Sequence, residues 1–145
     1  MRFIIVTSLF LLATCNSPKQ EMDSLKIPEF LLGEFIDDYG VKYSISDSIL
    51  TMEGHTKLHI LEWNLEEKYF VGQNDSLNPY DPLLFTRIDW MKFENMLPFE
   101  WGFCMSAYNA PSLDSAKVAS SADRENPKTG CGGYPFSRMK RTKTN

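Results

Sequence analysis

The sequence predicts a mainly β protein: a small antiparallel meander closed or flattened into a barrel, with one short C-terminal helix. Strand-like segments recur about every 8–12 residues with turn-forming residues between them. Aromatic residues, which favour strands, make up 13% of the chain. A meander of about seven short strands must close or be covered, because open strand edges invite pairing with other chains.

The expected strands follow from period-2 alternation of apolar and polar residues. The alternation is clearest at Val41, Tyr43 and Ile45, which follow a turn at 38–40. After an opening segment that starts at Gly33, the expected strands are 41–46, 49–53, 57–63, 68–73, 84–90 and 100–108. In the last of these, Trp101, Phe103 and Met105 share one face and Cys104 lies on the other.

A change of pattern after Pro111 ends the run of strands. Ser112 can cap a short helix that reaches about Ala122. A polar loop and a glycine-rich segment around Cys131 follow. The β domain is expected to span 30–137, and the basic tail 138–145 is interpreted as a solvated end, with an anionic membrane contact as the alternative.

The first 14 residues are expected to be a lipoprotein signal peptide. Arg2 precedes an apolar run that is about half of the roughly 20 residues needed to span a bilayer. The residues Leu12-Ala13-Thr14-Cys15 resemble the bacterial lipobox. The resemblance implies cleavage before Cys15, diacylglycerol on its thiol and an acyl chain such as palmitate on the new amino terminus. The alternative is an ordinary secretory signal that happens to contain a cysteine.

Residues 15–29 then form the lipidated cysteine and a flexible polar tether. Asn16 after the anchor cysteine resembles, in enteric-type sorting, lipoproteins that are passed to the outer membrane rather than kept at the inner one. Removal of residues 1–14 takes away Arg2 and leaves 14 basic and 19 acidic side chains, a net charge of −5. This balance argues against a nucleic-acid partner. The expected partners are the membrane, through Cys15, and an envelope protein.

Two cysteines remain once Cys15 carries lipid. Cys104 and Cys131 are expected to form a disulfide in the oxidising envelope, and the alternative is two free thiols or one reactive thiol. The bridge would close a loop of about 28 residues, which stabilises the fold by roughly 3–4 kcal/mol in the loop-entropy model.

Metal and catalytic sites are not expected. His55 and His59 flank a predicted strand, and four strand residues span about 13 Å, too far for one ion. The motifs of nucleophilic hydrolases, zinc hydrolases and phosphate-binding loops are absent from the sequence. No catalytic residue, metal ligand or cofactor is therefore assigned.

A polar site is a weaker possibility in two segments. The stretch 72–82 contains Asn74, Asp75, Asn78 and Tyr80, whose oxygens could bind a cation or polar ligand at a barrel mouth. The alternative is that these residues form ordinary Asx turns. In the strand 84–90, Thr86, Ile88 and Trp90 share one face. Arg87 and Asp89 share the other, where a buried pair would fix register or line a pocket if that face were the barrel interior.

Several segments together resemble a group of small bacterial lipoproteins of unassigned function. These segments are 33–45, 71–75 with 78–80, 87–90, 104–111 and 130–133. The resemblance implies a compact β domain with a disulfide and carries no activity. The Gly33-x-Phe35 start is also faintly similar to lipocalin-type barrels, where Gly-x-Trp plugs the barrel base.

Three functions follow as hypotheses. The first is a lipid-anchored interaction or structural module of the cell envelope, without catalysis. The second is a calycin-like carrier of a small apolar ligand, and the third is an envelope hydrolase. A filled interior around Tyr43, Ile45, Trp90 and Phe103 would favour the module, and an apolar cavity of a few hundred Å³ would favour the carrier.

Overall fold

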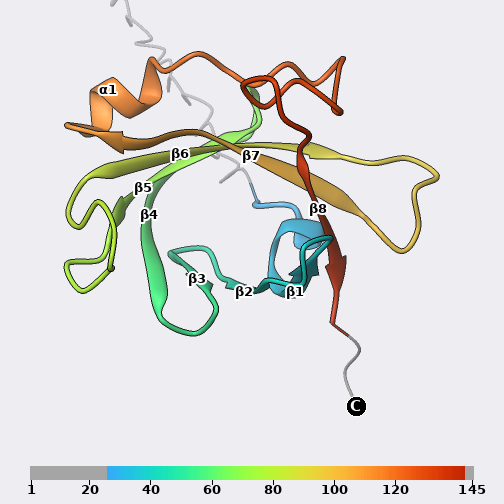
Figure 1. Cartoon of the computed structure of the whole chain (residues 1–145), viewed down its shortest axis with the longest axis horizontal. Coiled ribbons are helices and arrows are strands. Elements are labelled where there is room, and N and C mark those ends of the chain that lie inside the picture. Colours follow the sequence, from blue (N-terminus) through green and yellow to red (C-terminus); the bar gives the residue numbers. More distant parts are fainter. Residues whose placement is uncertain (1–25, 143–145) are drawn as a thin grey trace, which may run out of the picture.

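The structure, a computed structural model, describes residues 26–142 and is a closed barrel of eight antiparallel strands with one short α-helix (Figure 1). The prediction of a mainly β barrel is confirmed. Each strand pairs with its neighbours in chain order, and the last strand pairs with the first. The strands are β1 (Gly33–Asp37), β2 (Lys42–Ile45), β3 (Ile49–Met52), β4 (Thr56–Asn64), β5 (Tyr69–Asn74), β6 (Phe85–Lys92), β7 (Trp101–Ala110) and β8 (Ser137–Arg141). The helices are the 3-10 helix η1 (Glu29–Leu31) and α1 (Leu113–Lys117).

β8 is the main difference from the expected strand pattern. The interpretation of 138–145 as a solvated tail is wrong for the residues up to Arg141, which complete the barrel. β8 pairs with β7 on one side and with β1 on the other. Met139 is fully buried between the more exposed Arg138 and Lys140. One apolar residue among basic ones is too short a pattern to indicate a strand.

The other expected boundaries hold to within one or two residues, except at the helix and the tether. Ser112 caps α1 as predicted, since its Oγ accepts a hydrogen bond from Ser115 N. The helix ends at Lys117 instead of Ala122. The carbonyls of Lys117 and Ala119, at and just after the end of the helix, accept hydrogen bonds from Arg87. At the N-terminal side, Ile27 already packs against the core, so the expected tether 15–29 ends before that residue.

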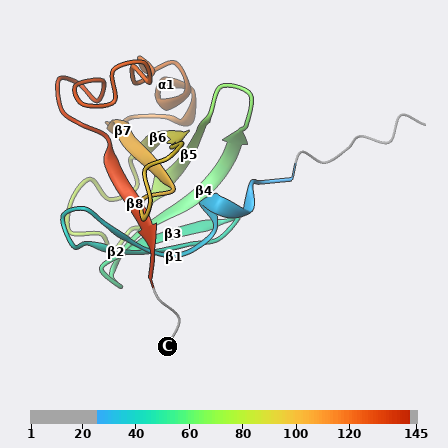
Figure 2. The same ribbon diagram turned by 90° about the vertical axis from the view of Figure 1, so that its right-hand side faces the viewer.

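The two ends of the barrel differ. Because neighbouring strands alternate in direction, η1 and the β6–β7 hairpin lie at one end, here called the base. The β3–β4 and β5–β6 loops lie at the other end, here called the mouth. Figure 1 shows the β5–β6 loop at the left and the β6–β7 hairpin at the right. Viewed from that right-hand side, η1 crosses the barrel end beside β4 (Figure 2).

Aromatic side chains fill the base. The fully buried Phe35 packs edge-on against Trp101, with ring centroids 5.4 Å apart. The Arg141 guanidinium lies over Phe35, 5.0 Å from its centroid, and donates to the carbonyls of Leu32 and Glu29. Gly33, at φ +120°, leaves room for that guanidinium, which would lie 2.9 Å from an added Cβ. The base is therefore closed by η1, Phe35 and Arg141 together.

The middle of the barrel is also filled. Tyr43, Ile45, Trp90 and Phe103 are all buried in one apolar cluster. Outside the barrel, α1 and the segment up to β8 form a second layer over β5, β6 and β7 (Figure 1). Both faces of β6 are consequently covered, which is why Thr86 to Trp90 are all buried.

Shortening the buried side chain of β8 should test the closure of the barrel. We expect Met139→Ala to lower the free energy of unfolding by about 2–5 kcal/mol, because Met139 is fully buried and leaves a cavity. The control is Met96→Ala, since Met96 is partly exposed on the β6–β7 hairpin and should change stability by less than about 1 kcal/mol. Urea unfolding measures both. Equal effects in the two variants would contradict the role given to β8.

Candidate functional site

The residues expected to form a polar site lie in two separate places. Asn74, Asp75, Asn78 and Tyr80 lie at the mouth. Arg87 and Asp89 lie on the outer face of β6, beneath the second layer, and not in the barrel interior. The lipidation site Cys15 falls outside the described residues.

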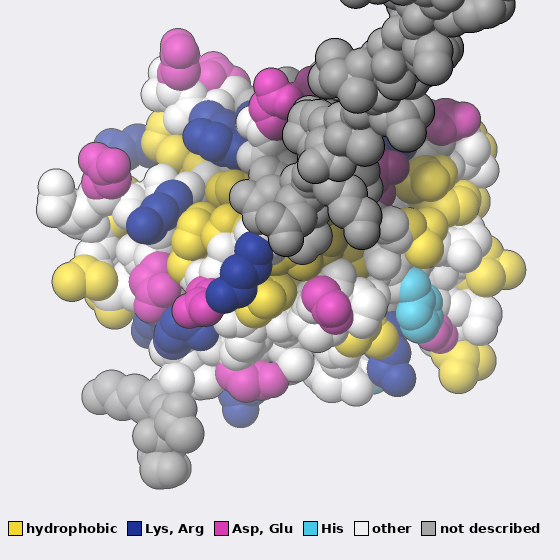
Figure 3. All heavy atoms as spheres, turned by 180° about the vertical axis from the view of Figure 1, so that it is seen from behind, with side chains coloured by type: hydrophobic (Ala, Val, Ile, Leu, Met, Phe, Trp, Pro, Cys, Tyr) yellow, Lys and Arg dark blue, Asp and Glu magenta, His cyan; other side chains and the backbone are white. Residues whose placement is uncertain are grey.

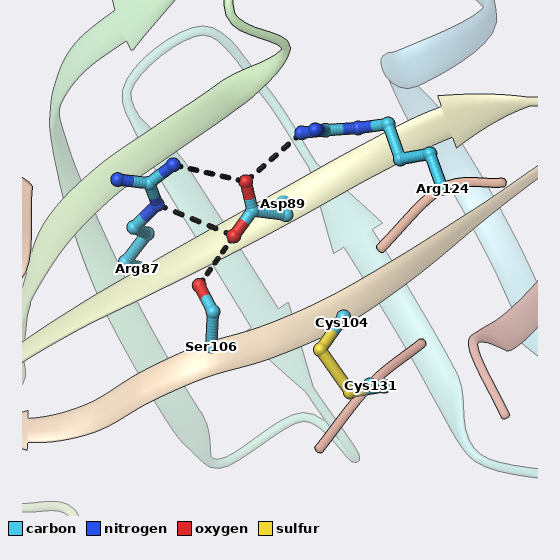
Figure 4. The surroundings of a disulfide bond; sticks show 6 residues. All are labelled: Arg87, Asp89, Cys104, Ser106, Arg124 and Cys131. Atoms are coloured by element: carbon cyan, nitrogen blue, oxygen red, sulfur yellow. Dashed lines mark hydrogen bonds and ion pairs between the residues drawn. A yellow bond between two sulfur atoms is a disulfide. The ribbon is translucent and has the colours of Figure 1, made fainter. Parts of the chain in front are cut away.

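Asp89 is the centre of a buried ionic cluster that we call the outer clamp, formed by Arg87, Asp89, Ser106 and Arg124 (Figure 4). Asp89 is completely buried. Arg87 approaches it with Nε and Nη2 at 3.2 and 3.1 Å, and Arg124 Nη2 lies 2.9 Å from Oδ1. The Ser106 hydroxyl donates to Oδ2. Charge-assisted bonds from three side chains offset the cost of burying this carboxylate.

The remaining donors of the outer clamp bind main-chain carbonyls. Arg87 Nη1 donates to Lys117 O at 2.6 Å and to Ala119 O at 3.2 Å. These bonds satisfy carbonyl groups at and just after the end of α1, which would otherwise need the next turn of the helix as a partner. The helix therefore ends at Lys117. Arg124 donates to the carbonyls of Trp90 and Lys68. The cluster therefore fastens the second layer to the barrel wall.

A polar depression of about 610 Å³ lies beside the outer clamp. Its walls include Arg87, Arg124 and Lys117, which would suit an anion if they were free. However, the two guanidiniums are bound to Asp89 and to carbonyls, and Lys117 Nζ lies 2.8 Å from Glu62 Oε2. These three cationic groups are already engaged, and the fourth cationic residue of the wall, Lys68, is a single exposed lysine, so we assign the depression no ligand.

The predicted disulfide between Cys104 and Cys131 is confirmed, with Cα atoms 5.4 Å apart. Cys104 lies on the outer face of β7, opposite the core residues Trp101 and Phe103, as the alternation predicted. It packs with Phe136 and Ala122. The bridge thus ties the glycine-rich segment to the barrel wall (Figure 4).

Asn74 is the structural centre of the mouth. Its Nδ2 donates to the carbonyls of Asp81 and Tyr108, and its Oδ1 accepts from Thr86 Oγ1 at 2.7 Å. Its main chain bonds to Leu83 and Leu84. Both polar groups of the Asn74 side chain therefore hold the β5–β6 loop against β6 and β7.

Asn78 and Asp75 also serve the loop. Asn78 forms two bonds with the main chain of Lys57, at 2.9 and 2.7 Å. Asp75 accepts from Leu77 N and lies 2.7 Å from His59 Nε2. These two bonds hold the pKa of the Asp75 carboxyl below its ordinary value. The Asx-turn alternative describes Asp75, whereas Asn78 bonds to a distant main chain and Tyr80 is 81% exposed.

Beneath this loop the barrel contains a pocket of about 300 Å³, which we call the mouth pocket. Its deeper wall is apolar and comes from four different strands, through Leu50, Leu58, Ile88 and Met105. Tyr80 and Tyr108 line its entrance side, together with Lys57 and His55. The sequence did not identify the residues of the pocket floor, because they are single residues from separate strands.

Two further observations concern other kinds of site. Within residues 26–142, no three histidine, cysteine or acidic side chains gather as a metal-binding group. Over the same part of the chain, no helix has the length and apolar character required to cross a membrane.

Breaking the outer clamp should destabilise the fold strongly. We expect Asp89→Ala to lower the free energy of unfolding by about 3–5 kcal/mol, because it leaves the buried Arg87 without its counter-ion. The matched control is Glu62→Gln, which removes the half-exposed partner of Lys117 and should cost less than about 1 kcal/mol. Chemical denaturation compares the two. A small loss for Asp89→Ala would mean that the cluster does not hold the second layer.

The Asp75 carboxyl should titrate below its ordinary range. Because the folded-state pKa is lowered, ionised Asp75 stabilises the β5–β6 loop above the unfolded pKa, and the stabilisation is lost as pH falls through the folded pKa. In His59→Ala the pKa should rise only partway, since Leu77 N still donates to the carboxylate. NMR titration of the side-chain carboxyl measures both values. An unchanged Asp75 pKa in His59→Ala would show that the histidine contact does not contribute.

No protein-family model matches the chain, and the searches of curated proteins and of solved structures also give no match. The mouth pocket and the residues that shape it are therefore the features that indicate a function.

Proposed function

We propose that the protein is a lipid-anchored cell-envelope protein that binds a small apolar ligand in the mouth pocket without reacting with it. The observation that carries the proposal is an apolar-floored pocket of about 300 Å³ at one end of a barrel whose base is closed. Pockets of this kind, at the mouths of β-barrels, are common ligand sites.

The chemistry of the pocket wall favours an apolar ligand. The amide and hydroxyl groups of Asn74, Asn78 and Thr86 are bound to other protein groups. A polar ligand group at the pocket floor would lose its water without gaining a partner, which is costly. An engineered cavity of about 150 Å³ accommodates benzene, so the mouth pocket suits a two-ring group or a short alkyl chain.

The anchor remains part of the proposal. Acyl chains on Cys15 would hold the protein on a membrane, since each buried methylene contributes about 0.8 kcal/mol. The outer membrane is the expected location, because Asn16 follows the anchor cysteine. A binding protein held there would meet apolar molecules close to the lipid surface.

The non-catalytic interaction or structural module is the second candidate. It is favoured by the packed interior of the barrel. The middle is filled by Tyr43, Ile45, Trp90 and Phe103, so the pocket is confined to the mouth. In this alternative the mouth would receive a side chain of an envelope protein partner instead of a free ligand.

Filling the mouth pocket should weaken ligand binding. The probe is N-phenyl-1-naphthylamine, an uncharged fluorophore with a two-ring naphthyl group and a phenyl group. The protein is the chain from Asn16, which contains every described strand and the disulfide. We expect Met105→Trp to weaken binding at least tenfold, because the indole occupies the pocket. The control is Met96→Trp at the base, which should bind like the parent. Equal affinities for the two variants, or no saturable binding by the parent, would contradict the proposal.

A further inference from the structure

Four large apolar side chains stand in solvent at the mouth, and we call them the mouth rim. Leu77 is 89% exposed, Tyr80 81%, and Leu83 and Tyr108 57% each. Three of them belong to the β5–β6 loop, and Tyr80 and Tyr108 also line the mouth pocket. Seen from behind, hydrophobic side chains protrude at the right-hand edge of the molecule, the end that carries this loop (Figure 3).

We propose that the mouth rim docks on the surface of a lipid bilayer, so that the mouth pocket exchanges an alkyl chain directly with the membrane. This inference rests on the proposed function, because it names the source and the class of the apolar ligand. Leucine side chains gain by entering the acyl region, and tyrosine places its ring at headgroup level with its hydroxyl in water. The rim offers both kinds of side chain at the same end of the barrel, and its two tyrosines line the pocket.

The exposure of the rim is maintained by the fold. Asp81 and Leu83 both have positive φ, 48° and 64°, which is costly for residues other than glycine. The bonds of Asn74 and Gln73 to the carbonyls of Asp81 and Leu83 hold this conformation. Leu83 is thereby kept outside the core instead of folding inward over the pocket.

The chain between the anchor and the barrel is long enough for this orientation. Eleven residue steps separate Cys15 from Lys26, and they reach at most ~40 Å when extended. The tether enters at the base, so it must pass along the barrel to let the mouth face the membrane. β6 runs between the two ends in eight residues, or about 23 Å along the strand. The tether therefore exceeds the barrel length.

The charges near the mouth indicate which lipid surface it fits. Asp75 and Asp81 lie in the same loop as the rim, and Lys57 lies at the pocket entrance. Removal of residues 1–14 would leave the chain with a net charge of −5. Anionic lipids would repel this surface, so apolar contact must supply the attraction. The mouth therefore fits a neutral phosphatidylcholine surface, and anionic lipid should not strengthen the contact.

The experiment measures co-sedimentation of the chain from Asn16, which lacks the lipid anchor, with phosphatidylcholine vesicles. We expect the double variant Leu77→Ser/Leu83→Ser to bind the vesicles at least tenfold more weakly than the parent. The matched control is Leu97→Ser, because Leu97 is 87% exposed at the base, on the β6–β7 hairpin. This control should bind like the parent. Thermal unfolding verifies that all variants are folded.

Three results would overturn the inference. They are failure of the parent to bind vesicles, weaker binding only in Leu97→Ser, and self-association of the parent in lipid-free buffer that the rim variant abolishes. Binding of N-phenyl-1-naphthylamine separates this inference from the function on which it rests. If the parent binds the probe but not the vesicles, membrane docking is contradicted and the ligand site is retained. If the parent does not bind the probe, the proposed ligand site itself is contradicted.

Discussion

Pairing of β8 with both β1 and β7 is the constraint on which the rest of the structure depends. It turns a meander with two open edges into a closed wall, and it buries Met139 against the core. The same strand carries Arg141, which binds the carbonyls of η1 and covers Phe35. Closure of the wall and closure of the base are thus achieved by one short strand.

The polar groups of the molecule serve mainly to hold its parts together. The outer clamp around Asp89 and the disulfide of Cys104 attach the second layer to the barrel, and Asn74 attaches the β5–β6 loop. The mouth also contains an apolar pocket floor and exposed apolar side chains that these contacts do not involve. The proposed binding role is therefore based on these apolar features.

Much of the barrel could be predicted from alternation, because most strands have one core face and one outer face. The faces of β7 are an example, with Trp101 and Phe103 inside and Cys104 outside. Alternation also places Arg87 and Asp89 on a common face of β6. Alternation does not show which face of a strand points inward when both faces are covered. In β6 the second layer covers the outer face. Sequence alone therefore left open whether this pair lines the interior.

Other features depend on contacts between distant residues. Arg124 comes from a polar loop and reaches Asp89 only after the second layer has folded over β6. The floor of the mouth pocket combines Leu50 of β3 with Met105 of β7. No local sequence pattern predicts such combinations, because each residue resembles an ordinary core or loop residue of its own segment.

The bond between Arg141 and the carbonyl of Leu32 joins residues 109 positions apart, which has a consequence for biogenesis. Contacts of such long range are slow to form, because the intervening loop must first be closed at an entropic cost. A nascent chain that has emerged only as far as β7 exposes unpaired edges on both β1 and β7. Such an intermediate is prone to aggregate, so its two open edges need protection until β8 has been synthesised and has paired with both of them.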